Sequence, residues 1–168
     1  FTVPNWEWPS QFGAGFTWNA TNRLMLSADY KKINWSETMR TINIVFTPDA
    51  GNGGIAATVP FPQNWNDQNV YMIGAQYKVT DAIAVRVGYN YSENPVPNST
   101  LNHLFPAIVE SHYTFGIGWQ INPTNSMAFS IAHAPKVTAT NPNGFGAGAA
   151  ATNTHSQTTW RINYNYHF

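Results

Sequence analysis

The stretch WRINYNYHF, residues 160–168, alternates strictly between aromatic or aliphatic side chains and polar ones. Successive side chains of a β-strand point to opposite faces, so a period of two separates two surfaces. The apolar surface would carry Trp160, Ile162, Tyr164, Tyr166 and Phe168. This division is typical of a strand in a membrane barrel, which needs an apolar face for lipid and a polar face for a wet lumen.

The same alternation recurs in six other segments, which are residues 11–19, 23–31, 70–80, 82–91, 111–121 and 126–134. Each segment has about the 9–11 residues that a tilted strand needs to cross a bilayer. The sequence therefore predicts an all-β fold, an antiparallel transmembrane β-barrel with about seven strands. Residues 1–168 would all belong to that single domain.

The charged residues favour this barrel over a soluble β-sandwich. Only 10% of residues are charged, whereas ordinary soluble domains contain about 25%. The charges within the predicted strands all lie on the polar side, and they are Arg23, Asp29, Lys31, Lys78, Arg86 and Arg161. An Arg or Lys facing lipid at the midplane would cost about 2–4 kcal/mol. The net charge of +0 gives no indication of nucleic-acid binding.

The connections predict the orientation. Three are short, whereas residues 36–69, 92–110 and 137–156 form long loops rich in Pro, Gly and Asn. Because outer-membrane barrels have short periplasmic turns and longer extracellular loops, we expect a bacterial outer-membrane location with a periplasmic C-terminus. The pattern slips in residues 32–46, which either extend the second strand or begin a folded loop.

Seven strands are too few for a closed bacterial barrel, which has an even number from eight upward. An open sheet edge cannot face lipid, because its backbone groups would lack hydrogen-bond partners. The sequence is therefore expected to be the C-terminal part of a longer barrel. An N-terminal part of the same barrel would supply the missing strands.

Several motifs resemble known outer-membrane proteins. Residues 160–168 resemble the C-terminal signal that the outer-membrane assembly machinery reads. Residues 8–16, 65–77, 85–97 and 112–119 are similar, in order and spacing, to the outer-membrane long-chain fatty acid transporters, a family that includes aromatic-hydrocarbon uptake channels. The resemblance implies a 14-stranded barrel, of which this chain is the second half. The family's N-terminal hatch and kinked exit strand would lie outside it.

The expected function is an outer-membrane channel for long-chain fatty acids or related hydrophobic molecules, working by passive diffusion without a cofactor. Its partners would be outer-membrane lipid and a hydrophobic ligand. The alternative is a structural or interaction barrel without transport, and a polar-solute porin comes third. The five histidines show no metal-ligand spacing, and no Ser–His pair indicates an enzyme.

Arg86 is the main candidate for ligand binding because it is a mid-strand charge on the lumen side. Arginine offers a fixed fork of donors to a carboxylate, so Arg86 is a candidate counter-ion for a fatty acid. A structural ion pair with Asp29 is the competing interpretation. Lys31, Lys78 and Arg161 are weaker candidates for the same role.

Apolar residues are numerous in the predicted loops. They are Phe46, Ile55, Val59, Phe61, Trp65, Leu101, Leu104, Phe105 and Ile108. They either form a hydrophobic groove that captures the ligand or pack the loops into a cap. Phe61, Trp65, Leu104 and Phe105 are the candidates for ligand contact.

Overall fold

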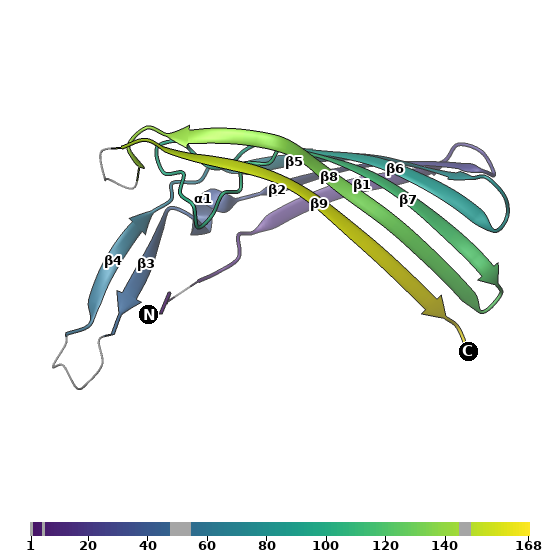
Figure 1. The fold of residues 1–168 in the computed structure, drawn as a ribbon, viewed down its shortest axis with the longest axis horizontal. Helices are drawn as coiled ribbons and strands as arrows, with labels where there is room; N and C mark the ends of the chain where they lie inside the picture. The colour runs from purple at the N-terminus through teal and green to yellow at the C-terminus, as the bar shows by residue number, and fades with distance from the viewer. Residues whose placement is uncertain (1, 5, 48–54, 145–148) are drawn as a thin grey trace.

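A computed structural model describes residues 2–4, 6–47, 55–144 and 149–168. Seven antiparallel strands form the main sheet in the order β1-β2-β5-β6-β7-β8-β9. Their bounds are β1 Gln11–Asn19, β2 Leu24–Ile33, β5 Gln68–Lys78, β6 Ile83–Ser92, β7 Ser111–Asn122, β8 Asn125–Asn141 and β9 Ala151–Tyr166. The sheet is an open arch rather than a closed barrel (Figure 1).

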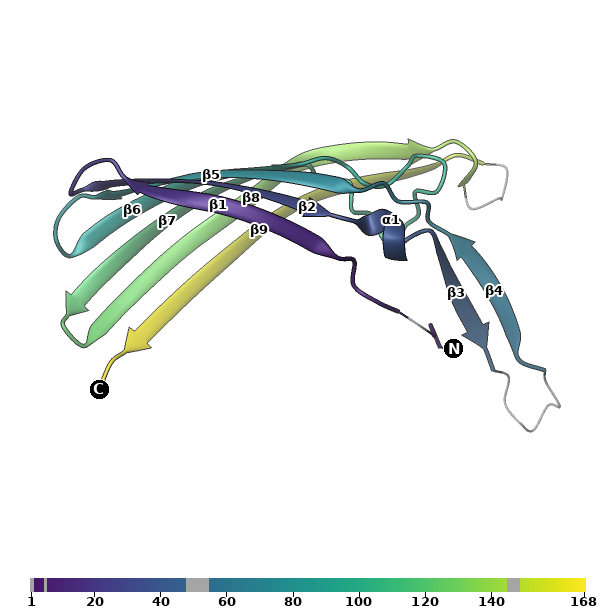
Figure 2. The ribbon, with the colours of Figure 1, turned by 180° about the vertical axis from the view of Figure 1, so that it is seen from behind.

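The connections divide the arch into two ends. Short turns join β1 to β2, β5 to β6 and β7 to β8, and we call this side, where the C-terminus also lies, the turn end. The other side, the loop end, holds the helix α1 (Trp35–Thr38) and the hairpin of β3 (Thr41–Phe46) and β4 (Ala57–Pro62). Both hang on the concave side (Figure 2). Residues 32–46 therefore enter a folded loop, the second of the two interpretations of this segment, after a short extension of β2.

The last two strands are longer than the sequence predicts. β8 continues to Asn141 and β9 begins at Ala151, so most of the predicted loop 137–156 is a hairpin. The register shifts between Ala134 and Val137. Such a bulge inserts an extra residue and reverses the alternation beyond it. This reversal explains why the predicted strand ended at residue 134, although β8 continues to Asn141.

The strand register separates the apolar and polar faces as the sequence predicts. Cross-strand partners share a face, and one such row joins Trp18, Leu26, Ala75, Val87, Phe115, Ile131 and Trp160. This apolar face is convex and largely exposed, with Trp160 64% and Ile162 70% accessible. A surface so rich in exposed apolar side chains needs lipid rather than water around it.

Two ring pairs lie on this face near the loop end. The Tyr30 and Tyr71 rings lie 5.4 Å apart, and those of Tyr89 and Tyr113 lie 5.1 Å apart. Tyrosines at such positions form the interfacial belts of membrane proteins. No helix of the described residues is long and apolar enough to span a membrane.

The buried core lies among the loops rather than within the sheet. Its buried members are Met39, Ile42, Trp65, Val96, Leu101 and Ile108. Val137 and Ala139 of β8 pack against this cluster from above. The loops therefore form a packed cap on the concave side of the loop end.

Candidate functional site

Polar and small residues line the concave face of the sheet. One cross-strand row contains Gln76, Arg86, Gly116, Ser130 and Arg161 in that order. Gly116 and Ser130 are small, so the two arginines stand at opposite sides of a low floor. The row confirms the predicted lumen-side parity of Arg86 and Arg161.

Arg86 is held by a neutral partner. Its Nε donates a hydrogen bond to Oε1 of Gln76 at 2.6 Å. Its terminal nitrogens lie over Gly118, where an added Cβ would stand 2.8 Å from Nη1. A larger residue at position 118 would therefore displace the guanidinium from this position.

The predicted ion pair between Arg86 and Asp29 is absent. Among the described residues, the one ion pair joins Lys32 and Asp67. Asp29 instead occupies the space above Gly15, where a Cβ would collide with its carboxylate. Asp29 pairs with Met72 and Met72 with Asn90, a row four residues along β6 from Arg86.

The structure brings Lys78 to Arg86 but keeps Lys31 away. Lys78 and Arg86 line one polar hollow on the turn-end half of the concave face, together with Gln76, Asp81, Gln120, Ser126 and Asn165. Lys31 lies away from this hollow, near the loop end of β2, where it pairs with Gly13 and Val70. The two cations of this hollow outnumber its one carboxylate, so the hollow suits an anionic head group.

The loop candidates divide between the two interpretations given above. Trp65 is 6% exposed and belongs to the buried core, while Phe61 and Phe105 are half-buried against it. Leu104 is 67% exposed. Packing therefore accounts for Trp65, whereas Leu104 and one side of Phe105 remain on a surface.

A series of aromatic rings extends from this core to the surface, and sequence reasoning did not predict it. The centroid separations are 5.2 Å for Trp65–Trp35, 6.4 Å for Trp35–Trp8, 6.3 Å for Trp8–Trp6 and 6.4 Å for Trp6–Phe105. Trp8 is 76% exposed. The signal available in the sequence was the alternating Trp6-Glu7-Trp8 next to β1.

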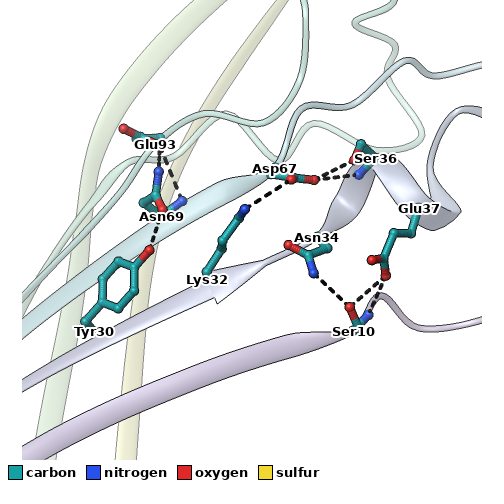
Figure 3. Close-up of polar contacts among 9 residues, drawn as sticks. All are labelled: Ser10, Tyr30, Lys32, Asn34, Ser36, Glu37, Asp67, Asn69 and Glu93. Atoms are coloured by element: carbon teal, nitrogen blue, oxygen red, sulfur yellow. Dashed lines mark hydrogen bonds and ion pairs between the residues drawn. The ribbon is translucent and has the colours of Figure 1, made fainter.

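Polar contacts fix the loop end of β2 and β5, and we call this group of contacts the rim (Figure 3). Lys32, which the longer β2 places on the convex side, lies 3.6 Å from the Asp67 carboxylate. Asp67 also accepts hydrogen bonds from the Ser36 hydroxyl at 2.7 Å and the Ser36 backbone N–H at 3.1 Å. These bonds from Ser36, aided by the charge of Lys32, lower the pKa of Asp67 below its ordinary value of 3.8.

Two further contacts belong to the same rim. Glu37 of α1 accepts a hydrogen bond from the Ser10 hydroxyl at 2.7 Å, which ties the helix to the chain entering β1. Tyr30 donates to Asn69, whose side-chain amide donates to Glu93 at 2.7 Å. The rim therefore fixes α1 and the adjoining loop segments to the loop ends of β1, β2 and β5.

The terminal segment has the predicted alternation. Trp160, Ile162, Tyr164 and Tyr166 are exposed on the convex face, and the rings of Tyr166 and Phe168 lie 5.6 Å apart. The intervening Arg161, Asn163 and Asn165 pair with small residues of β8 on the concave face. No three His, Asp or Glu side chains of the described part of the chain gather to hold a metal ion.

The chain matches a family model described as "Outer membrane protein transport protein (OMPP1/FadL/TodX)" over residues 5–168. Similar solved structures include the Ralstonia pickettii toluene transporter TbuX, with 24% identity, a TM-score of 0.71 and coverage of 98% of this chain and 35% of that one. The Pseudomonas putida toluene transporter TodX has 22% identity and a TM-score of 0.75, with 99% and 36% covered. A Pseudomonas aeruginosa FadL homologue has 21% identity and a TM-score of 0.64, with 93% and 34% covered. No curated protein matches, and the chain spans about a third of these structures.

Proposed function

Because the chain belongs to the outer membrane transport protein family of FadL and TodX, we propose that its complete barrel is a passive outer-membrane channel for hydrophobic molecules. The family is a family of transport channels rather than enzymes. Long-chain fatty acids or related amphipaths are the proposed ligands, and an N-terminal half would close the barrel. The turn end would face the periplasm, and the assembly machinery would insert the barrel through residues 160–168.

One arrangement carries the proposal. The exposed rings of Trp6 and Trp8 and the half-buried ring of Phe105 lie at the loop end, and Arg86 lies in the polar hollow of the concave face. The rings suit an apolar body, whereas a guanidinium without a carboxylate partner suits an acidic head. We propose that Trp6, Trp8, Leu104 and Phe105 capture the ligand and that Arg86 and Lys78 receive its head group.

Uptake by cells that lack or carry the full-length protein tests this function. The protein should accelerate entry of a long-chain fatty acid and of toluene, and dissipation of the proton gradient should leave the outer-membrane step unchanged. Phe105→Asp should reduce both rates without changing the heat-resistant folded form. If cells that carry the folded barrel take up both compounds no faster than cells that lack it, transport would be contradicted and a structural barrel favoured.

A further inference from the structure

The β8–β9 hairpin extends past the apolar belt at the loop end. Ile131 and Trp160 form the last large apolar pair on its convex face, and His133 and Thr158 follow. Beyond the bulge, Val137 and Ala139 pack on the loop core. Since alternate residues point oppositely, Thr138 and Thr140 face away from the loops.

The inner face of this extension is covered. The Asn141 side-chain amide donates to the Leu101 carbonyl at 2.9 Å, and a His155 ring nitrogen lies 3.3 Å from the Pro106 carbonyl oxygen. Ala134 is 1% exposed. The loops therefore fix the hairpin from inside, and its outer face is the surface available to a partner.

Hydroxyl groups form that outer face. The Oγ1 atoms of Thr138 and Thr154 lie 3.1 Å apart, and those of Thr140 and Thr152 lie 3.0 Å apart. A hydroxyl has one donor and two acceptor sites, so each pair retains capacity for another partner. Lys136 is exposed beside them in the bulge. We call Lys136, Thr138, Thr140, Thr152 and Thr154 the hydroxyl strip.

The charge around the strip favours an anionic partner. Residues 111–168 contain Lys136 and Arg161 but no Asp or Glu. A phosphate near Lys136 would therefore meet no carboxylate from β7, β8 or β9. A row of hydroxyls beside one cation suits a sugar that carries phosphate groups.

We propose that the hydroxyl strip docks the phosphorylated saccharide head group of outer-leaflet lipopolysaccharide. The strip continues the lipid-facing surface directly. At about 3.3 Å per residue, Thr138 lies roughly 20 Å along the strand beyond Ile131, or about 15 Å higher for a strand tilted by about 40°. Phospholipid head groups occupy only about 5–8 Å on each side of the hydrocarbon. The strip therefore lies beyond the head-group layer, at the level of the saccharides of lipopolysaccharide. The inference rests on the proposed orientation but not on transport.

Lipid binding by the purified full-length protein tests the inference. Lipopolysaccharide with a phosphorylated inner core and, separately, phosphatidylglycerol would be titrated and counted by native mass spectrometry. Thr138→Val with Thr154→Val and Lys136→Ala should weaken lipopolysaccharide binding about tenfold, the loss of roughly one charge-assisted hydrogen bond. Valine preserves the strand preference. Binding of phosphatidylglycerol should not change.

The matched controls are Thr17→Val and Lys31→Ala, which change the same residue types on the concave face. They should bind lipopolysaccharide as the parent does. Equal lipopolysaccharide binding by parent and strip variant would overturn the inference, as would an equal loss of phosphatidylglycerol. If the triple variant fails to fold, Lys136→Ala alone, which changes an exposed side chain, should also weaken lipopolysaccharide binding, and unchanged binding would overturn the inference. Loss of lipopolysaccharide binding with normal uptake, or the reverse, separates this inference from the transport proposal.

Discussion

Arg86 and Gln76 are cross-strand partners joined by a hydrogen bond of 2.6 Å from Nε to Oε1. The amide orients the guanidinium but does not neutralise it. The two terminal nitrogens lie over Gly118. A bound carboxylate would therefore find an oriented cation without displacing a competing anion.

Replacement of the neutral partner tests this arrangement. Gln76→Glu places a carboxylate opposite Arg86, so the internal pair should compete with a fatty-acid head group. We expect fatty-acid binding to weaken by about 1–3 kcal/mol, the worth of a charge-assisted hydrogen bond, with toluene uptake unchanged. Asn90→Asp adds the same charge to another concave row and should have little effect. An equal loss in both variants would show a general charge effect instead.

The division of the faces predicts opposite tolerance to arginine. Val85→Arg and Ile117→Arg, which replace cross-strand partners on the convex face, should each cost about 2–4 kcal/mol or block assembly. Thr114→Arg on the concave face should assemble. Gly88 is a poor comparison, because an added Cβ would lie 2.5 Å from the Thr114 hydroxyl. Folded protein in outer membranes, measured by its heat-sensitive gel mobility, gives the result; similar yields for all three would refute the lipid-facing assignment.

The terminal ring should control assembly. Phe168→Ala removes the last apolar position of the proposed signal, and the folded fraction in outer membranes should fall several-fold. Leu104→Ala, which removes another exposed apolar side chain, at the loop end, should assemble normally. If both variants reach the membrane as efficiently as the parent, residues 160–168 do not act as the signal.

The rim contact should depend on pH. The lowered pKa of Asp67 means that the folded chain binds this proton less readily than the unfolded chain. Its stabilising contribution is therefore complete well above pH 3.8 and is lost as the pH falls through the lowered pKa. The protection factor of the Ser36 amide, which compares its hydrogen-exchange rate with that of an unstructured amide at the same pH, should fall over that acidic range.

A pair of carboxylate variants separates this contact from general acid effects. Asp67→Asn should make the Ser36 amide exchange faster already at neutral pH, because it removes the ion pair with Lys32 and weakens the acceptor. Asp81→Asn, a change in the turn between β5 and β6, should leave Ser36 unaffected. Unchanged exchange in Asp67→Asn would mean that the rim is held without this carboxylate.

The sequence was sufficient for the faces of the sheet because they depend on a local period of two. Arg86 lies on the predicted side, and residues 160–168 alternate as expected. The extension of β8 was not predicted, because the bulge between Ala134 and Val137 interrupts that period. A single register shift therefore hid a long hairpin.

Side-chain partners were less predictable than faces. The contact of Arg86 with Gln76 rather than Asp29 depends on how β6 aligns with β5, which alternation does not specify. The ring series from Trp65 to Trp6 joins segments far apart in the sequence. Such contacts follow from the packing of the loops, and composition gives no measure of it.

Cysteine labelling of the full-length protein tests the central claim, that the concave face lines a path for hydrophobic ligands. The chain itself has no cysteine, and the complete protein would be used in a background free of others. Ser130→Cys, on the row between Gly116 and Arg161, should react with a water-soluble maleimide and be protected by a long-chain fatty acid. Phe129→Cys on the convex face should not react. Labelling of Phe129→Cys, or reaction of Ser130→Cys at the same rate with and without fatty acid, would contradict the account.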